Sequence, residues 1–186
     1  MKIAIASDFH ENLHNTILFL EKAKELSVEK LILLGDYTSP GTVKLLINSN
    51  LPIAMIWGNN DGEKVVITKL ALAHRDMVHL ANTTYDSLEI NGRKIFITHY
   101  DDLAKPMAES GDFDAVFYGH NHQKNITHLE DCLIVNPGEI CALRTGMASF
   151  AIYDTKTNSA KIIDLKNSIS TKTELTMPHI KAVGMN

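Results

Sequence analysis

Apolar runs alternate with polar segments from the start of the chain. Between the first two runs, Leu13, Ile17, Leu20 and Ala23–Lys24 form an apolar stripe at helical spacing, and residues 39–50 predict a shorter helix. Strands and helices that alternate with short joints indicate a parallel βαβ core with right-handed crossovers. Runs of aliphatic residues are typical of strands covered on both faces. The runs that predict buried strands are residues 2–8, 30–36 and 52–59.

The second half of the chain has the pattern of paired strands. A helix is predicted at about residues 62–75, and residues 84–100 then form two runs around Asn91-Gly92, the strongest short signal for a β-hairpin. We therefore expect antiparallel or mixed β-structure here. The further elements expected are a short helix at 101–110, a buried strand at 114–120, and hairpins at 124–138 and 147–166 that turn near Glu130-Asp131 and at Lys156–Ser159.

No internal repeat or linker divides the chain, so residues 1–166 are expected to form one domain and the weakly patterned residues 167–186 a C-terminal tail. The formal net charge of −4 argues against general nucleic-acid binding, which needs a basic face. No apolar run reaches membrane length and the first residues contain no signal segment, so we expect a cytoplasmic protein without a membrane partner. Cys132 and Cys141 form no C-x-x-C pair and are expected to be small apolar residues near strands.

A carboxylate, amide or imidazole group follows each of five predicted strands. Taken singly, each of these residues could be a helix cap, a turn residue or a structural histidine. Taken together they are expected to converge, because ligands of open α/β sheets bind outside the carboxyl ends of the strands. Their oxygen and nitrogen atoms suit Mn²⁺, iron, Zn²⁺ or Ni²⁺, and the lack of thiolates argues against a structural zinc site. These residues are Asp8, His10, Asp36, Asn59, His99, His120 and His122.

Seven ligands are too many for one ion that keeps an open position, but they suit two ions that share a carboxylate. Such pairs of ions lie about 3.5–4 Å apart and stabilise the attacking and leaving oxygens of a displacement. Asp36, midway along the set, is the natural bridge. Two divalent ions carry more positive charge than two aspartates can neutralise. The remaining positive charge predicts a site for a phosphate oxyanion.

The motifs that carry these residues resemble those of calcineurin-like metallophosphoesterases, especially the small YfcE-like phosphodiesterases. The motifs are "SDFHEN", "LGD", "GNND", "THY" and "GHNH", followed by "NPGE", and the resemblance runs from residue 1 to about 166. It implies a four-layer α/β/β/α sandwich of two mixed sheets. It also implies a phosphodiesterase in which a hydroxide that bridges two metal ions attacks phosphorus.

The resemblance further implies how the ligands are shared. Asn12 is expected to donate a hydrogen bond near the phosphate, with a helix N-terminal turn residue as the alternative, and Asp36, Asn59 and His120 are also expected to take part in catalysis. The cofactors would be two divalent ions, with Mn²⁺ as the first choice and Ni²⁺, Zn²⁺, iron or Mg²⁺ as alternatives. The implied ligands are Asp8, His10, Asp36 and His122 for one ion, and Asp36, Asn59, His99 and His120 for the other.

Three departures from the family pattern concern the chemistry. Glu11 and Tyr100 stand where glycines are usual, and Asn60 stands where many members have the histidine credited with protonating the leaving group. Asp61 is present, but an amide at Asn60 cannot deliver a proton, so the general acid is left open. The metal-ligand set itself is complete.

Two other functions remain open on the sequence. A retromer subunit shares this fold and binds partners without an intact ligand set, so a non-catalytic scaffold is one alternative. A phosphomonoesterase that acts on nucleotides is the other. The expected partner is a phosphodiester or nucleotide-like small molecule, and the sequence does not indicate an oligomeric state.

Overall fold

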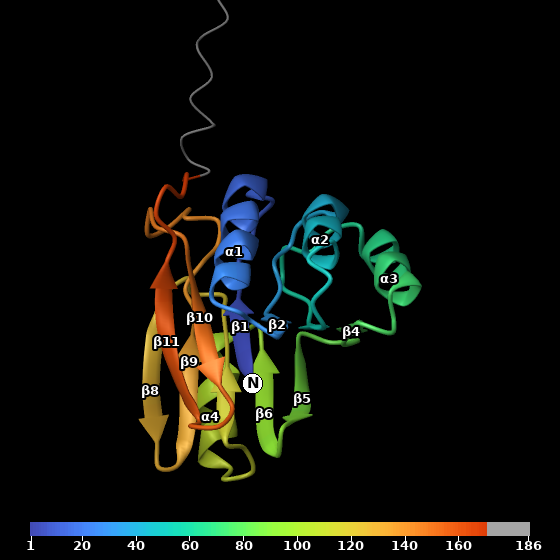
Figure 1. Ribbon diagram of the computed structural model, residues 1–186. Helices are drawn as coiled ribbons and strands as arrows, with labels where there is room; N and C mark the ends of the chain where they lie inside the picture. Colours follow the sequence, from blue (N-terminus) through green and yellow to red (C-terminus); the bar gives the residue numbers. More distant parts are fainter. Residues whose placement is uncertain (171–186) are drawn as a thin grey trace, which may run out of the picture.

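Two β-sheets packed face to face form the middle of the molecule (Figure 1). The computed structural model describes residues 1–170. In one sheet the strands lie in the order β11-β10-β1-β2-β3-β4, and in the other in the order β5-β6-β7-β9-β8. Each sheet contains both parallel and antiparallel pairs, so both sheets are mixed.

The six-stranded sheet contains the predicted parallel core. Strands β1 to β4 pair in parallel, and the alternating residues of β1 pack toward the other sheet (Ile3, Ile5) or toward the helices (Ala4, Ala6). The short edge strand β4 was not predicted. Antiparallel pairing of β10 with β1 adds the last hairpin to this sheet. The strands are β1 (Lys2–Ala6), β2 (Lys30–Leu33), β3 (Ile53–Met55), β4 (Val78–Leu80), β10 (Ser149–Asp154) and β11 (Ser159–Asp164).

The five-stranded sheet comes from the middle of the chain. Its first hairpin turns at Asn91 and Gly92, whose φ angles of 52° and 74° are the left-handed values that a tight hairpin turn needs. The next two pairings, β6 with β7 and β7 with β9, are parallel. The strands are β5 (Tyr85–Ile90), β6 (Arg93–Thr98), β7 (Ala115–Phe117), β8 (Asn125–Leu129) and β9 (Cys132–Asn136).

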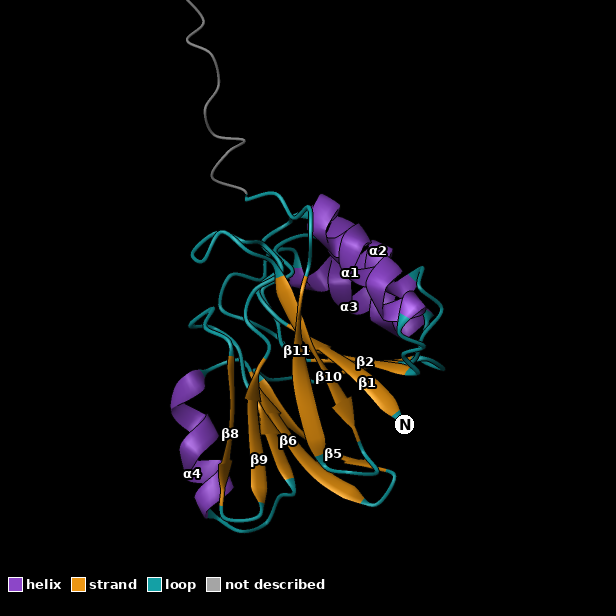
Figure 2. Ribbon diagram, turned by 60° about the vertical axis from the view of Figure 1, so that its left-hand side comes forward, coloured by secondary structure: helices purple, strands orange, loops and turns teal. Residues whose placement is uncertain are grey.

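Helices cover the two outer faces, which completes four layers (Figure 2). Helices α1, α2 and α3 pack on the six-stranded sheet, and α4 packs on the five-stranded sheet. One buried apolar cluster fills each of the three boundaries between layers. The predicted α/β/β/α sandwich is confirmed. The helices are α1 (Leu13–Glu25), α2 (Pro40–Ile47), α3 (Lys64–Ala73) and α4 (Ala104–Glu109).

Helix α1 forms where it was predicted, but the expected apolar stripe is wrong at its first two positions. Leu13 and Ile17 are 42% and 45% exposed, whereas Asn15, Thr16 and the apolar residues Phe19 and Ala23 are buried. The two polar side chains can be buried because each has a backbone partner: the Asn15 amide donates to Ile140 O, and the Thr16 hydroxyl donates to Asn12 O. Apolar periodicity alone could not reveal these partners.

The chain maintains contacts with the domain beyond residue 166. The Asn15 amide donates to Ile169 O at 2.9 Å, and Ile169 N donates to Asn15 Oδ1 at 2.9 Å. The domain boundary at 166 stays a prediction, and most of the predicted tail, residues 171–186, lies outside the described residues. None of the helices within residues 1–170 is long and apolar enough to cross a membrane.

Candidate metal centre

The carboxyl ends of five strands, three from one sheet and two from the other, bring the seven predicted ligands together. One group surrounds Asp8 and His10: Asp8 Oδ1 lies 3.3 Å from His122 Nε2, and Asp36 Oδ2 lies 3.4 Å from His10 Nε2. The rings of His10 and His122 stack with 5.3 Å between their centroids. Four of the predicted ligands therefore face one another here.

The second group surrounds the Asn59 side chain. Asn59 Oδ1 lies 2.8 Å from His99 Nε2 and 2.9 Å from His120 Nδ1. The other carboxylate oxygen of Asp36 lies 3.6 Å from His99 Nε2. Asp36 thus lies between the two groups, with one oxygen toward His10 and the other toward His99.

Five of the seven residues have left-handed backbone conformations. The φ angles are 55° at Asp8, 41° at His10, 58° at Asp36, 69° at His120 and 64° at His122. Such values are uncommon outside glycine and each costs on the order of 1–3 kcal/mol, so they persist only where surrounding contacts impose them. Strained backbone of this kind concentrates at functional sites.

Two glycines allow the loops to approach one another. A side chain at Gly58 would collide with the Asp36 carboxylate, and one at Gly119 would collide with the Ser7 hydroxyl group. Gly119 directly precedes His120, and Gly58 directly precedes Asn59. Close packing of backbone, which only glycine permits here, therefore sets the separation of the ligands.

The electrostatics of the first group fit a bound cation. Burial raises the pKa of the Asp8 carboxyl, against the opposing effect of His122 and His99, and burial lowers the pKa of His10. Asp8 Oδ1 and His10 Nε2 are buried and make no hydrogen bond within the part of the chain that the structure describes. A buried carboxylate oxygen and a neutral imidazole nitrogen, both without a hydrogen-bond partner, are the ligand atoms that a divalent ion would satisfy.

The second group fits a cation for a different reason. His99 Nδ1 lies 2.7 Å from Leu34 O, which can only accept, so Nδ1 carries the proton and a neutral ring offers a lone pair at Nε2. That lone pair faces Asn59 Oδ1, itself an acceptor. A cation bound by both atoms would remove the repulsion between these two acceptors.

Glu139, the last residue of the "NPGE" motif, was not predicted as part of the site, but it supports the first group. This fully buried residue accepts a 2.6 Å hydrogen bond from His122 Nδ1, and so leaves Nε2 of that ring free to bind a metal. Burial alone would raise the pKa of Glu139, but hydrogen bonds from His122, Cys141 and Thr145 lower it well below its ordinary value. An acid immediately after a strand-ending Asn-Pro-Gly turn was the signal that could have identified it.

Asn12 is engaged as a helix cap. Its Oδ1 accepts a 3.0 Å hydrogen bond from Asn15 N, and its Nδ2 donates to Cys141 O and to Ile169 O, at 3.1 and 2.8 Å. This geometry is that of the helix N-terminal alternative. The contact of Asn12 with a phosphate stays a prediction.

Asn60 and Asp61 both contact Asp36, Asn60 at its carboxylate and Asp61 at its backbone N–H. The backbone N–H and the side-chain amide of Asn60 donate to the two oxygens of Asp36, both at 2.8 Å. Asp61 accepts from the backbone N–H groups of Gly58, Thr38 and Asp36, at 2.6, 3.0 and 3.2 Å. Asn60 therefore orients the central carboxylate, and Asp61 holds together the loops that carry it.

Cys141 lies close enough to His10 and His122 to be considered as a ligand, with potential ligand atoms within 4.8 Å of one another. Its thiol instead donates to Glu139 Oε2 at 3.0 Å, and burial together with that carboxylate raises the pKa of the thiol. It lies 3.9 Å from Nδ1 of His122, the atom that faces Glu139. A metal site without thiolate stays our prediction.

The sequence comparisons place the chain among phosphoesterases. Residues 1–158 match the family model of the calcineurin-like phosphoesterase superfamily domain. Phosphodiesterase MJ0936 of Methanocaldococcus jannaschii is 36% identical over 170 residues, an alignment that covers 89% of this chain and all of that protein.

Solved structures show the same fold. An archaeal phosphodiesterase described as structurally and functionally characterised superposes with a TM-score of 0.82 at 34% identity, covering 89% of this chain and all of the other. YfcE, a phosphoesterase from E. coli, has a TM-score of 0.62 at 21% identity, covering 89% of this chain and all of YfcE. Vps29 from Chaetomium thermophilum has a TM-score of 0.64 at 16% identity, covering 88% of this chain and 95% of Vps29. At these identities, the last two likenesses concern the fold alone.

Proposed function

Because this chain belongs to the calcineurin-like phosphoesterase superfamily, we propose that it is a metal-dependent phosphodiesterase with a binuclear centre. The observation that carries the proposal is the position of Asp36, whose two oxygens face separate groups of ligand-type atoms. The name of the relative at 36% identity supports the choice of diesters.

The residues present suit two divalent ions, for which Mn²⁺ is our first choice. When bound, such ions neutralise phosphoryl oxygens and generate a hydroxide nucleophile from water near neutral pH. The ion between Asp8 and His10 would also be held by Asp36 and His122, and the ion beside Asn59 would also be held by Asp36, His99 and His120.

The protein's own contribution is to hold the metal-ligand atoms in position before an ion binds. Leu34 O and Glu139 fix the tautomers of His99 and His122, so that each neutral ring presents Nε2. The two hydrogen bonds from Asn60 hold the plane of the Asp36 carboxylate. Little reorganisation is then needed during the reaction.

We also propose a preference for phosphodiesters with good leaving groups. An amide at Asn60 has no acidic proton, and in the structure it is occupied with Asp36. General acid catalysis contributes roughly 10²–10⁴ in rate, so without it the leaving group must be stable by itself. Nitrophenolate meets this condition and an alkoxide does not.

The test compares Asp36→Asn with His122→Ala. Loss of the shared carboxylate should remove both ions and the hydrolysis of bis(p-nitrophenyl) phosphate, whereas His122→Ala should weaken mainly one ion. Asp112→Asn, at an exposed position, serves as the control. Metal content close to two ions per chain and unchanged activity in Asp36→Asn would contradict the shared bridge.

A scaffold function has less support. The likeness to Vps29 concerns the fold, and all seven ligand positions here carry side chains able to bind metal. The cytoplasmic location and the small-molecule partner remain proposals, as does the alternative of monoester substrates.

A further inference from the structure

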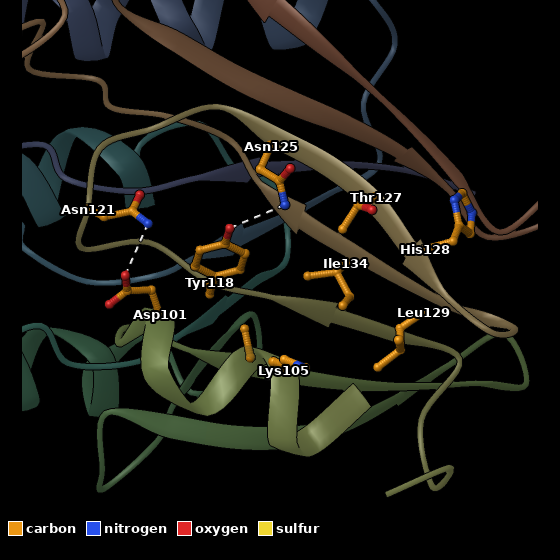
Figure 3. A pocket seen from close by; sticks show the side chains of 10 residues that line it. Asp101, Lys105, Tyr118, Asn121, Asn125, Thr127, His128, Leu129 and Ile134 are labelled. Carbon is orange, nitrogen blue, oxygen red and sulfur yellow. Dashed lines mark hydrogen bonds between the residues drawn. The ribbon is translucent and has the colours of Figure 1, made fainter. Parts of the chain in front are cut away.

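A groove runs between helix α4 and strands β8 and β9 (Figure 3). Its volume is about 340 Å³, within the usual range for small-molecule sites of roughly 300–1,000 Å³. Two lining residues belong to the loops that carry ligands: Asn121 lies between His120 and His122, and Asp101 lies two residues after His99. One end of the groove therefore lies next to the loops that carry His99, His120 and His122.

The end of the groove nearest the centre is polar and fixed. Asn121 Nδ2 donates to Asp101 Oδ2 at 3.1 Å (Figure 3). Asn121 Oδ1 accepts from Asn136 Nδ2 at 2.9 Å. Asp101 Oδ1 makes no hydrogen bond within residues 1–170 and is available as an acceptor. Farther along, Tyr118 Oη accepts from Asn125 Nδ2 at 3.3 Å. This end can hydrogen-bond hydroxyl groups.

The other end is less polar, although Lys105 and His128 also line the groove. Thr127 and Leu129 extend from β8, Ile134 extends from β9, and Ala104 of α4 closes the opposite wall. The Tyr118 ring lies between the polar and the apolar ends (Figure 3). A ligand that fits this order has hydroxyl groups near the phosphate and a flat, mostly apolar part beyond them.

We propose that the groove binds a nucleoside as one arm of the phosphodiester, with its sugar at Asp101 and Asn121 and its base at Tyr118, Thr127 and Ile134. This rests on the proposed function, because the arm is placed by a phosphate at the metal centre. A long acyl chain fits less well, since the volume is small and a carboxylate and two amides line the entrance. The inferred substrate class is therefore a nucleotide diester.

The test fills the groove without touching the metal ligands. Thr127 is exposed on edge strand β8, where tryptophan is compatible with a strand, so Thr127→Trp should occupy the apolar end. Ile126→Trp, on the neighbouring residue of the same strand, is the matched control because Ile126 does not line the groove. The two substrates are thymidine 5′-(p-nitrophenyl phosphate) and methyl p-nitrophenyl phosphate, which release the same leaving group.

We expect Thr127→Trp to lower kcat/KM for the thymidine ester about 10-fold or more, since pocket contacts discriminate by roughly 10–200-fold, and to change the methyl ester less than about twofold. Ile126→Trp should leave both unchanged. Equal losses for the two esters in Thr127→Trp, or no loss for either, would overturn the proposal.

Calorimetric binding of thymidine 5′-monophosphate separates this proposal from the proposed function. If the wild type hydrolyses neither ester, the proposed function fails. The groove assignment would still stand if Thr127→Trp alone weakened binding of the nucleotide, and would fall if all variants bound it equally or none bound it. Should Thr127→Trp not fold, Asp101→Ala replaces it, with an expected loss of several-fold in the binding of the same nucleotide.

Discussion

Glu139→Gln should reveal how much of the metal site depends on one buried carboxylate. Glu139 Oε2 accepts from His122 Nδ1 at 2.6 Å and from Leu143 N at 3.0 Å, while Oε1 accepts from the backbone N–H groups of Arg144 and Thr145, at 2.9 and 2.7 Å. Glutamine has the same shape but presents an NH₂ group on one side. In either orientation, three donors face this NH₂ group instead of an acceptor; one of the three is the thiol of Cys141 or the hydroxyl group of Thr145, which can rotate away.

The magnitude follows from these contacts. A buried donor left without an acceptor costs about 1–3 kcal/mol, so the one or two backbone donors left in this way should lower the free energy of unfolding by about 1–6 kcal/mol. With the NH₂ group toward His122, the ring would accept at Nδ1 and carry its proton at Nε2, which blocks metal binding. With the NH₂ group toward Arg144 and Thr145, His122 donates to a neutral amide oxygen instead of a carboxylate, which makes its ring a less basic and weaker metal ligand. Loss of such supporting partners typically weakens metal binding about 10–100-fold.

The assay combines urea unfolding with calorimetric titration of Mn²⁺ and Zn²⁺. Glu130→Gln, at an exposed turn, is the matched control for the chemical change. Thr145→Val removes the hydroxyl group that donates to Glu139 Oε1 at 2.8 Å but leaves the contact between Glu139 and His122. This change should therefore reduce stability more than metal affinity. Metal affinity equal to that of the wild type in folded Glu139→Gln would refute the argument that this carboxylate sets the tautomer of His122.

Three other perturbations test the thiols, the missing general acid and a carboxylate at the surface. Replacement of Cys132 and Cys141 by serine should leave metal content and activity intact, because a serine hydroxyl group at position 141 can still donate to the carboxylate of Glu139. Elemental analysis measures the metal content, and loss of metal from a folded variant would make Cys141 a ligand. Asn60→His should speed poor leaving groups more than good ones, and an unchanged slope of log rate against leaving-group pKa would exclude this role. The backbone N–H of Lys94 lowers the pKa of Asp114 below its ordinary value of 3.8, so this carboxylate adds stability above pH 3.8 that is lost as pH falls through the lower folded pKa. Acid unfolding of Asp114→Asn should therefore show a smaller stability loss in this pH range than the wild type. Equal losses in the two proteins would contradict the lowered pKa of Asp114.

The sequence by itself determined the order of elements and the composition of the candidate site. Short aliphatic runs predicted the buried strands, and Asn91-Gly92 predicted a hairpin, because strand burial and turn conformation act on neighbouring residues. Polar residues at the strand ends predicted a common site, since parallel strands place their carboxyl ends at one edge. The motif resemblance predicted the four-layer fold, which the structure confirms.

Only the tertiary structure decided which groups hold that site in place. The buried face of α1 depends on Ile140 and Ile169, more than a hundred residues away in the sequence, and these carbonyls make Asn15 a core residue while Ile17 stays exposed. Glu139 acts on His122 only after β9 and β7 have paired. Periodicity records what each residue prefers locally, whereas a buried hydrogen bond needs a partner that only long-range packing supplies.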